Sequence, residues 1–200
     1  MPFDHNDHYH RLLLGHVPRG CRTALDVGCG TGRFARRLAE SGTEVDAVDP
    51  SAEVIEAALS ASRTERHEPC FRHADVTQTE LPRDHYDFIS CLASIHHMPF
   101  GTLTALRDAL APGGTLVVLG CYRERSPLDF AWSLAAVPVN AVARVAVAVR
   151  ERARPGPGVR APVKHPEMPL AQVRQEAAAL LPGTVVRRLL FWRYLLVFRK

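Results

Sequence analysis

Short apolar runs alternate with amphipathic stretches along the first 120 residues of the chain. The runs have the length of buried strands. They occupy residues 23–28, 45–48, 69–73, 87–92 and 115–119. Between them, apolar residues recur at helical spacing, which predicts helices over 31–41 and 103–110, the latter stopped at Pro112. Strands alternating with helices at these intervals predict an α/β fold with a parallel sheet and right-handed crossovers.

The helix that follows the second strand shows the amphipathic pattern clearly. Ser51 is in position to cap it. Its buried face is expected to hold Val54, Ile55, Ala58 and Leu59, which share one side at helical spacing.

The pattern changes after the fifth strand. Residues 122–150 are apolar and helical in character, and residues 151–169 contain five prolines and four basic residues, which predicts an exposed connection. A last helix is expected over 172–181, and 184–198 forms two adjacent strands. The first 19 residues predict a short helix that packs its leucines on the core. With no repeat and no second apolar pattern, residues 1–200 form one domain.

A glycine-dense turn between the first strand and the first helix carries the clearest chemical signal. It reads Asp26-Val27-Gly28-Cys29-Gly30-Thr31-Gly32. Glycine lets a backbone approach a nucleotide closely, and a helix N-terminus offers unpaired N–H groups. The spacing is Gly-x-Gly-x-Gly, whereas a dinucleotide pyrophosphate is bound by Gly-x-Gly-x-x-Gly. Asp49, twenty-one residues past Gly28, ends the second strand, where a carboxylate can accept hydrogen bonds from ribose hydroxyls.

This turn resembles the first motif of the class I S-adenosylmethionine (SAM)-dependent methyltransferases almost letter for letter. The resemblance continues in order through Asp49, Ala74-Asp75-Val76, the segment Tyr86 to His97, and Leu110 to Gly114. It implies a three-layer, Rossmann-like sandwich with a mostly parallel seven-stranded sheet. The C-terminal hairpin would supply its one antiparallel strand.

The resemblance also implies how SAM is bound. Asp49 would hold the ribose, Asp75 and the backbone of Val76 the adenine, and Asp26 the methionine amino group together with nearby carbonyls. The cofactor-binding set is then Asp26, Gly28, Cys29, Gly30, Gly32, Asp49, Pro50, Asp75, Val76 and Leu92. Structural alternatives stay open: the glycines can form a plain turn, and Asp26 can hold the glycine loop through backbone N–H groups. Asp46 is expected to face solvent.

Two histidines follow the fourth strand. Ile95-His96-His97 resembles the Leu-His-His of many family members that act on small molecules. Methyl transfer can rely on proximity and alignment, and a general base is needed only when the acceptor is protonated. His96 and His97 are therefore the candidate catalytic residues, and structural packing of either one is the alternative.

Histidines also gather near the N-terminus, at His5, His8 and His10. No carboxylate or cysteine partner completes a metal-ligand set, so no metal is expected. We expect residues 1–19 to form a flap over the cofactor pocket, with Tyr9 or His10 touching the ligand.

The acceptor is predicted to be a small organic molecule. Amine methylators of nucleic acids and proteins in this family often carry Asn/Asp-Pro-Pro-Tyr/Phe after the fourth strand, where this chain has Cys91-Leu92-Ala93-Ser94. Residues 122–169 are expected to form a lid over the acceptor. The alternatives are a SAM-binding protein without catalysis and an NAD-linked dehydrogenase. The glycine spacing and the lack of a substrate domain disfavour the dehydrogenase.

The composition of the chain indicates its partners and cellular location and agrees with this interpretation. The chain is 46% hydrophobic and 23% charged, with a net charge of +4 whose basic residues are scattered, which argues against nucleic acid as a partner. Its five cysteines have neither metal-ligand nor Cys-x-x-Cys spacing, which suits a reducing cytosol. They are Cys21, Cys29, Cys70, Cys91 and Cys121. The polar N-terminus does not resemble a signal peptide, so a cytoplasmic location is expected. Nothing in the composition fixes an oligomeric state.

One apolar stretch, Phe130 to Val149, is long enough to span a bilayer. Pro138, Asn140 and Arg144 interrupt it, and a charge near the centre of a span is costly. We therefore expect a buried or lid helix there, with no membrane contact.

Overall fold

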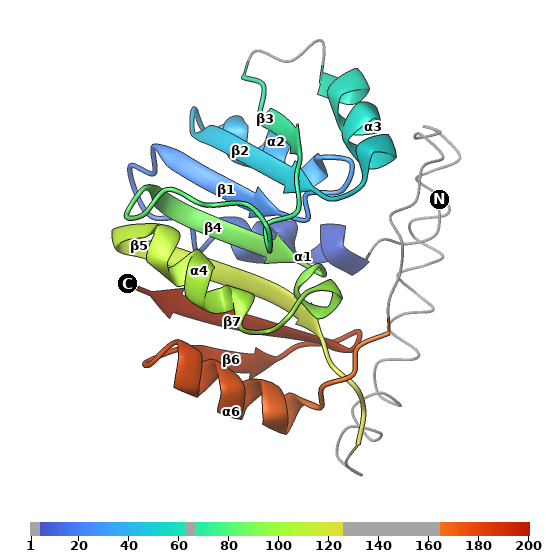
Figure 1. Cartoon of the computed structure of the whole chain (residues 1–200), viewed down its shortest axis with the longest axis vertical. Coiled ribbons are helices and arrows are strands. Elements are labelled where there is room, and N and C mark those ends of the chain that lie inside the picture. Colours follow the sequence, from blue (N-terminus) through green and yellow to red (C-terminus); the bar gives the residue numbers. More distant parts are fainter. Residues whose placement is uncertain (1–4, 63–66, 126–164) are drawn as a thin grey trace.

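The strands of this chain form one seven-stranded sheet in the computed structural model, which describes residues 5–62, 67–125 and 165–200 (Figure 1). The strands are β1 (Thr23–Val27), β2 (Glu44–Asp49), β3 (Cys70–His73), β4 (Tyr86–Leu92), β5 (Leu110–Cys121), β6 (Val185–Arg188) and β7 (Arg193–Arg199). Their order is β3-β2-β1-β4-β5-β7-β6, and β7 runs antiparallel to both of its neighbours. The predicted α/β sheet with one antiparallel strand from the C-terminal hairpin is confirmed.

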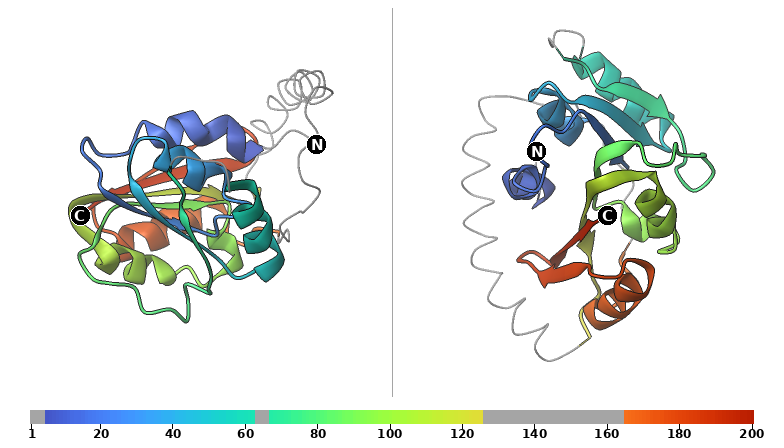
Figure 2. Two further views of the ribbon diagram at one scale, coloured as in Figure 1. Left: turned by 90° about the horizontal axis from the view of Figure 1, so that it is seen from above. Right: turned by 90° about the vertical axis from the view of Figure 1, so that its left-hand side faces the viewer.

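Helices cover both faces of the sheet, which gives three layers (Figure 2). One face carries α1 (His5–Leu14), α2 (Arg33–Ala39) and α3 (Ala52–Ser62). The other carries α4 (Thr102–Ala109) and α6 (Leu170–Leu180), and a short 3-10 helix, η1 (Ile95–His97), follows β4. Each face buries its own apolar cluster, because alternate residues of a strand point to opposite sides of the sheet.

The strand order reverses between β1 and β4. β2 and β3 lie on one side of β1, while β4 and β5 lie on the other, and all five run parallel. The loops that leave β1 and β4 therefore diverge at a switch point, and ligands of open α/β sheets bind at the carboxyl edge there. The glycine turn and the two candidate histidines follow these two strands.

Three local expectations differ from the structure. α2 begins at Arg33, because Gly32 has a φ of 74°, which is left-handed and outside the helix. α4 ends at Ala109, and Leu110 joins β5 opposite Tyr86. Leu59 was expected on the buried face of α3, but it is 47% exposed, so the apolar stripe of that helix is narrower than its sequence predicts.

The first four residues of the helix expected over 122–150 are not helical, and the rest of it and most of the proline-rich connection fall in residues 126–164, outside the described residues. Described residues on the two sides of that segment lie side by side: Arg123 pairs with Pro169, and the Arg123 N–H donates to the Met168 carbonyl at 2.9 Å. Within the described ranges, no helix is both long enough and apolar enough to cross a membrane, and Phe130 to Val149 lies outside them.

Candidate cofactor and acceptor site

The glycine loop at the end of β1 uses its three glycines in two ways. All three have positive φ: 69° at Gly28, 56° at Gly30 and 74° at Gly32. A Cβ at Gly28 would lie 2.3 Å from Ser94 Cβ, and one at Gly32 would lie 2.4 Å from the Phe71 ring. A Cβ at Gly30 would meet nothing within 4 Å. The outer glycines are therefore required for packing, while the space beside the central one is open.

Asp49 holds this loop in place. It is 8% exposed, and its two oxygens accept hydrogen bonds from the Gly30 N–H and the Ser51 N–H, each at 3.0 Å. The sequence left open that Asp26 has this role, but Asp49 performs it. Two further bonds, from the N–H groups of Gly28 and Cys29 to the Val48 carbonyl at 2.8 and 3.0 Å, tie the loop to the end of β2.

Asp26 is buried in β1 beneath the loop. Its Oδ1 accepts a hydrogen bond of 2.7 Å from the Ser90 hydroxyl on β4, a contact that sequence reasoning missed. Burial raises the pKa of Asp26 to about 7; the Ser90 hydrogen bond opposes this rise, and the charge of Asp49 adds to it. The Cys29 thiol also has a raised pKa, through burial and the same two carboxylates. The space beside the loop is therefore complementary to a cation.

The loop after β4 interlocks with the glycine loop. The Ser94 hydroxyl donates to the Val27 carbonyl at 2.6 Å and lies 2.9 Å from the Cys91 sulfur. Ala93 has a φ of 52°, and its N–H donates to the Leu119 carbonyl at 2.7 Å. Leu92, expected at the cofactor, is half-buried where β4 ends. This arrangement places η1 directly after the carboxyl end of the strand.

His96 and His97 both lie on η1. His96 is half-buried and His97 is exposed, and their ring centroids are 4.3 Å apart at an interplanar angle of 43°. The His97 N–H donates to the Ser94 carbonyl at 2.9 Å, which fixes the turn. The structure thus brings the two candidate histidines to the edge where the glycine loop ends.

The expected adenine residues follow β3. Asp75 is half-buried, and its Oδ1 accepts hydrogen bonds from the N–H and hydroxyl of Thr77 at 2.9 and 2.7 Å. These bonds, together with one from Gln78, lower the pKa of Asp75 and fix it as a carboxylate. Val76 is buried beside it. Pro50 is exposed, and its carbonyl lies 3.0 Å from His73 Nε2, which ties the end of β2 to β3.

The N-terminal helix is anchored to the β6–β7 turn and to α2. The buried Tyr9 donates its hydroxyl proton to the Leu190 carbonyl at 2.9 Å, and the His10 ring packs 5.0 Å from the Phe34 ring. The side chain of His5 is outside the described part. In that part, no group of three or more histidines, cysteines or carboxylates is arranged to hold a metal ion.

The environment of Asp46 differs from the prediction. It was predicted to face solvent, but it is half-buried, accepts a hydrogen bond of 2.7 Å from the Tyr86 hydroxyl, and forms an ion pair with Arg72. Tyr86 reaches it from β4, across β1. This contact between non-adjacent strands is structural and gives Asp46 no part in the site.

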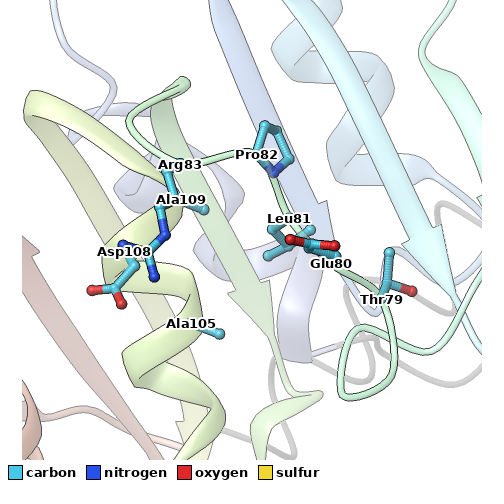
Figure 3. Close-up of a pocket in the computed structure, with 8 residues that line it drawn as sticks. All are labelled: Thr79, Glu80, Leu81, Pro82, Arg83, Ala105, Asp108 and Ala109. Atoms are coloured by element: carbon cyan, nitrogen blue, oxygen red, sulfur yellow. The ribbon is translucent and has the colours of Figure 1, made fainter.

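A hollow of about 630 Å³ lies away from this edge, between residues 79–83 and α4 (Figure 3). Glu80 and Leu81 line one wall, and Ala105 and Asp108 line the other. The Asp108 carboxylate is already paired with the neighbouring Arg107 at 2.8 Å. No residue of the expected site lines this hollow.

Comparisons with known proteins agree with the family that the sequence motifs indicate. A family model described as a methyltransferase domain matches residues 24–114. An uncharacterized methyltransferase of Mycobacterium tuberculosis is 36% identical over all of this chain and 98% of its own length. A ubiquinone biosynthesis O-methyltransferase of Nitrosospira multiformis is 32% identical over 52% of this chain and 46% of its own. The solved magnesium protoporphyrin IX methyltransferase of Synechocystis shares the fold, with a TM-score of 0.59 at 18% identity over 98% of this chain and 81% of its own.

Proposed function

Because this chain belongs to the class I SAM-dependent methyltransferases, we propose that it transfers the methyl group of SAM to a small organic acceptor. SAM is the cofactor of the family, and its sulfonium supplies the methyl group. The observation that supports the proposal best is the open space beside Gly30, at the tip of a loop that Asp49 holds and beneath which Asp26 is buried.

Each part of this space fits a part of SAM. Asp49 would accept hydrogen bonds from the ribose hydroxyls, because its carboxylate oxygens have further lone pairs beyond those used by the loop. Asp26 would accept from the methionine ammonium group, and the carbonyls of Gly28 and Leu92 would lie alongside. Gly30 leaves room for the methionine portion, with Cys29 and Gly32 shaping the loop around it. Asp75, Val76 and Pro50 would flank the adenine.

The acceptor would approach at the carboxyl end of β4. His96 or His97 would orient it there and would remove a proton when the acceptor carries one on the reacting atom. Residues 1–19 and 122–169 would close over it, because the second segment follows the carboxyl end of β5 and Tyr9 of the first bonds to the Leu190 carbonyl at the same edge. The Nitrosospira and Synechocystis proteins are described as acting in ubiquinone synthesis and on magnesium protoporphyrin IX, which supports a small acceptor. We infer a cytoplasmic setting, with neither nucleic acid nor membrane as a partner.

The proposal can be tested by measuring SAM turnover in the presence of fractionated cell extracts. The protein is incubated with SAM and either the small-molecule or the macromolecular fraction, and S-adenosylhomocysteine is measured. Turnover with the small-molecule fraction alone supports the proposal, and turnover only with macromolecules contradicts the acceptor class. SAM binding without turnover in either fraction favours the alternative, a SAM-binding protein without catalysis.

Three variants test the roles of individual residues. Asp49→Ala should weaken SAM binding at least ~10-fold, because hydrogen bonds to a charged group contribute ~1.5–3 kcal/mol each. His96→Gln and His97→Gln should leave SAM affinity nearly intact. If either histidine acts as a base, its variant lowers turnover ~10²-fold, and wild-type turnover rises with pH through the neutral range. If it orients the acceptor, the acceptor KM rises instead.

A further inference from the structure

Two carboxylates lie on the same face of neighbouring strands under the glycine loop. Asp26 is 1% exposed and Asp49 is 8% exposed. Asp26 pairs with Ala47 in the sheet register, and Asp49 lies two residues beyond Ala47 on the same side. The charge that acts on Asp26 is that of Asp49, which is also negative. Burying like charges together is unfavourable unless a cation joins them, so this pair is prepared for a positively charged ligand group.

Ser90 is the group that fixes the deeper carboxylate. It is fully buried in β4 and lies directly opposite Asp26 in the parallel register of β1 and β4. Its hydroxyl donates to Asp26 Oδ1 at 2.7 Å. Among the described residues, the other oxygen, Oδ2, accepts no hydrogen bond. The contact therefore sets the carboxylate's orientation and leaves one oxygen for a ligand.

We propose that Ser90 is a positioning residue for the cofactor, which holds Asp26 in the orientation and charged form that bind the ammonium group of SAM. The proposal rests on SAM as the cofactor and is independent of the identity of the acceptor. Ser90 itself does not touch the ligand, because it is fully buried and its hydroxyl lies 2.7 Å from Asp26 Oδ1 and 3.4 Å from the Leu25 carbonyl.

The electrostatics of the site explain why a single hydroxyl matters. The titratable groups that face Asp26 are Asp49 from β2, Cys29 from the glycine loop and Cys91 from β4. Burial raises the pKa of both thiols, to about 12 for Cys91, so they stay neutral. Burial alone favours the protonated form of Asp26, and the Ser90 hydrogen bond opposes this effect. Without Ser90, a neutral Asp26 would dominate near pH 7.

The test compares S-adenosylhomocysteine binding by wild type and Ser90→Ala, measured by isothermal titration between about pH 6 and 8.5. The product carries the same ammonium group and is not consumed. At neutral pH the variant should bind at least ~10-fold more weakly. The gap should narrow as the pH rises, because Asp26 then ionises without help. Titration of the ligand amine cancels in the ratio of the two proteins. Thr115→Val is the control: it deletes a buried hydroxyl on β5, two strands from β1, and should bind like wild type.

A double-mutant cycle with Asp26→Asn shows whether Ser90 acts through that carboxylate. Adding Ser90→Ala to Asp26→Asn should cause no further loss of affinity and should abolish the difference in pH profile. Equal loss at every pH, or a full additional loss in the Asp26→Asn background, would mean that Ser90 has only a packing role. Unchanged affinity in Ser90→Ala overturns the inference alone. A wild-type protein that binds neither SAM nor its product overturns the proposed function as well.

Discussion

Two stretches of left-handed backbone lie at the carboxyl edge of the sheet, and they are built in opposite ways. The glycine loop after β1 uses Gly28, Gly30 and Gly32, for which positive φ carries no steric cost. The turn between β6 and β7 instead places Phe191 and Trp192 at a φ of 58° each. Residues other than glycine rarely adopt positive φ, so this aromatic pair is unusual.

Tertiary contacts impose the second conformation. Phe191 is 1% exposed and packs against Tyr9 of α1, and the Trp192 ring N–H donates to Glu124 at 2.7 Å. A left-handed conformation costs ~1–2 kcal/mol for such residues, while burial of a phenylalanine contributes ~1.5–3 kcal/mol. The conformation of the glycine loop is therefore determined by its own residues. The β6–β7 turn depends on residues far away in the chain.

The largest expected effect separates two glycines of the same loop. Gly28→Val places a branched side chain against Ser94 in a left-handed backbone, so stability should fall by ~2–5 kcal/mol and SAM binding should be lost. The Cβ that Gly30→Val adds meets no protein atom within 4 Å, so this variant should lose only ~1–2 kcal/mol while still abolishing binding of SAM and S-adenosylhomocysteine. Thermal unfolding and isothermal titration measure the two effects.

The contrast between these variants is the decisive readout. Wild-type affinity for either ligand in Gly30→Val would mean that the loop is only a turn. Equal destabilisation by both substitutions would mean that the space beside Gly30 is closed by protein.

Phe191→Gly tests the other side of the comparison. The substitution removes the unfavourable backbone conformation but also removes a buried ring, and the ring contributes more. We expect a net loss of ~2–3 kcal/mol, or a fall in Tm of ~4–12 °C. A rise in Tm would show that the backbone cost outweighs the packing and would reverse our account of the turn.

The same difference between local and long-range determinants explains which features could be predicted from the sequence. The glycine loop, the alternation of strands with helices and the position of Asp49 follow from local patterns, so the sequence alone predicted them. The role of Asp49 in holding Gly30 was not, because it depends on how the ends of two strands meet. The Tyr9 hydroxyl bonds to a carbonyl 181 residues away, and Tyr86 reaches Asp46 across an intervening strand. No periodicity encodes such contacts. The sequence likewise gives no sign that Ser90 differs from the other residues of its strand. Its role follows only from the register of β1 and β4, which places it opposite Asp26.

The buried Asp26 carboxylate beneath the glycine loop destabilises the fold when it is charged, so stability should depend on pH. The pKa of Asp26 is raised to about 7 in the folded protein, above its ordinary value near 3.9. The folded state therefore holds more protons than the unfolded state between these values, and wild-type stability without ligand falls as pH rises through them. Asp26→Asn does not titrate, so it should match wild type near pH 4 and exceed it by ~3–4 kcal/mol near pH 8. Its SAM affinity should be lower. Parallel stability curves across this range would mean that Asp26 is not perturbed in the fold.

The smallest expected effect comes from Ala93, a third left-handed position, which lies between the two compared regions. Its φ is 52°, and it is half-buried with only a methyl group to lose. Ala93→Gly relieves ~1–2 kcal/mol of backbone strain and adds ~0.5–1 kcal/mol of lost chain entropy, so stability should rise by up to ~1 kcal/mol and Tm by ~2–4 °C. The N–H bond to the Leu119 carbonyl is retained, because glycine keeps the same donor. Thermal unfolding without ligand measures the change. A lower Tm would show that the Ala93 methyl group contributes packing that outweighs the strain, as the Phe191 ring does in the β6–β7 turn.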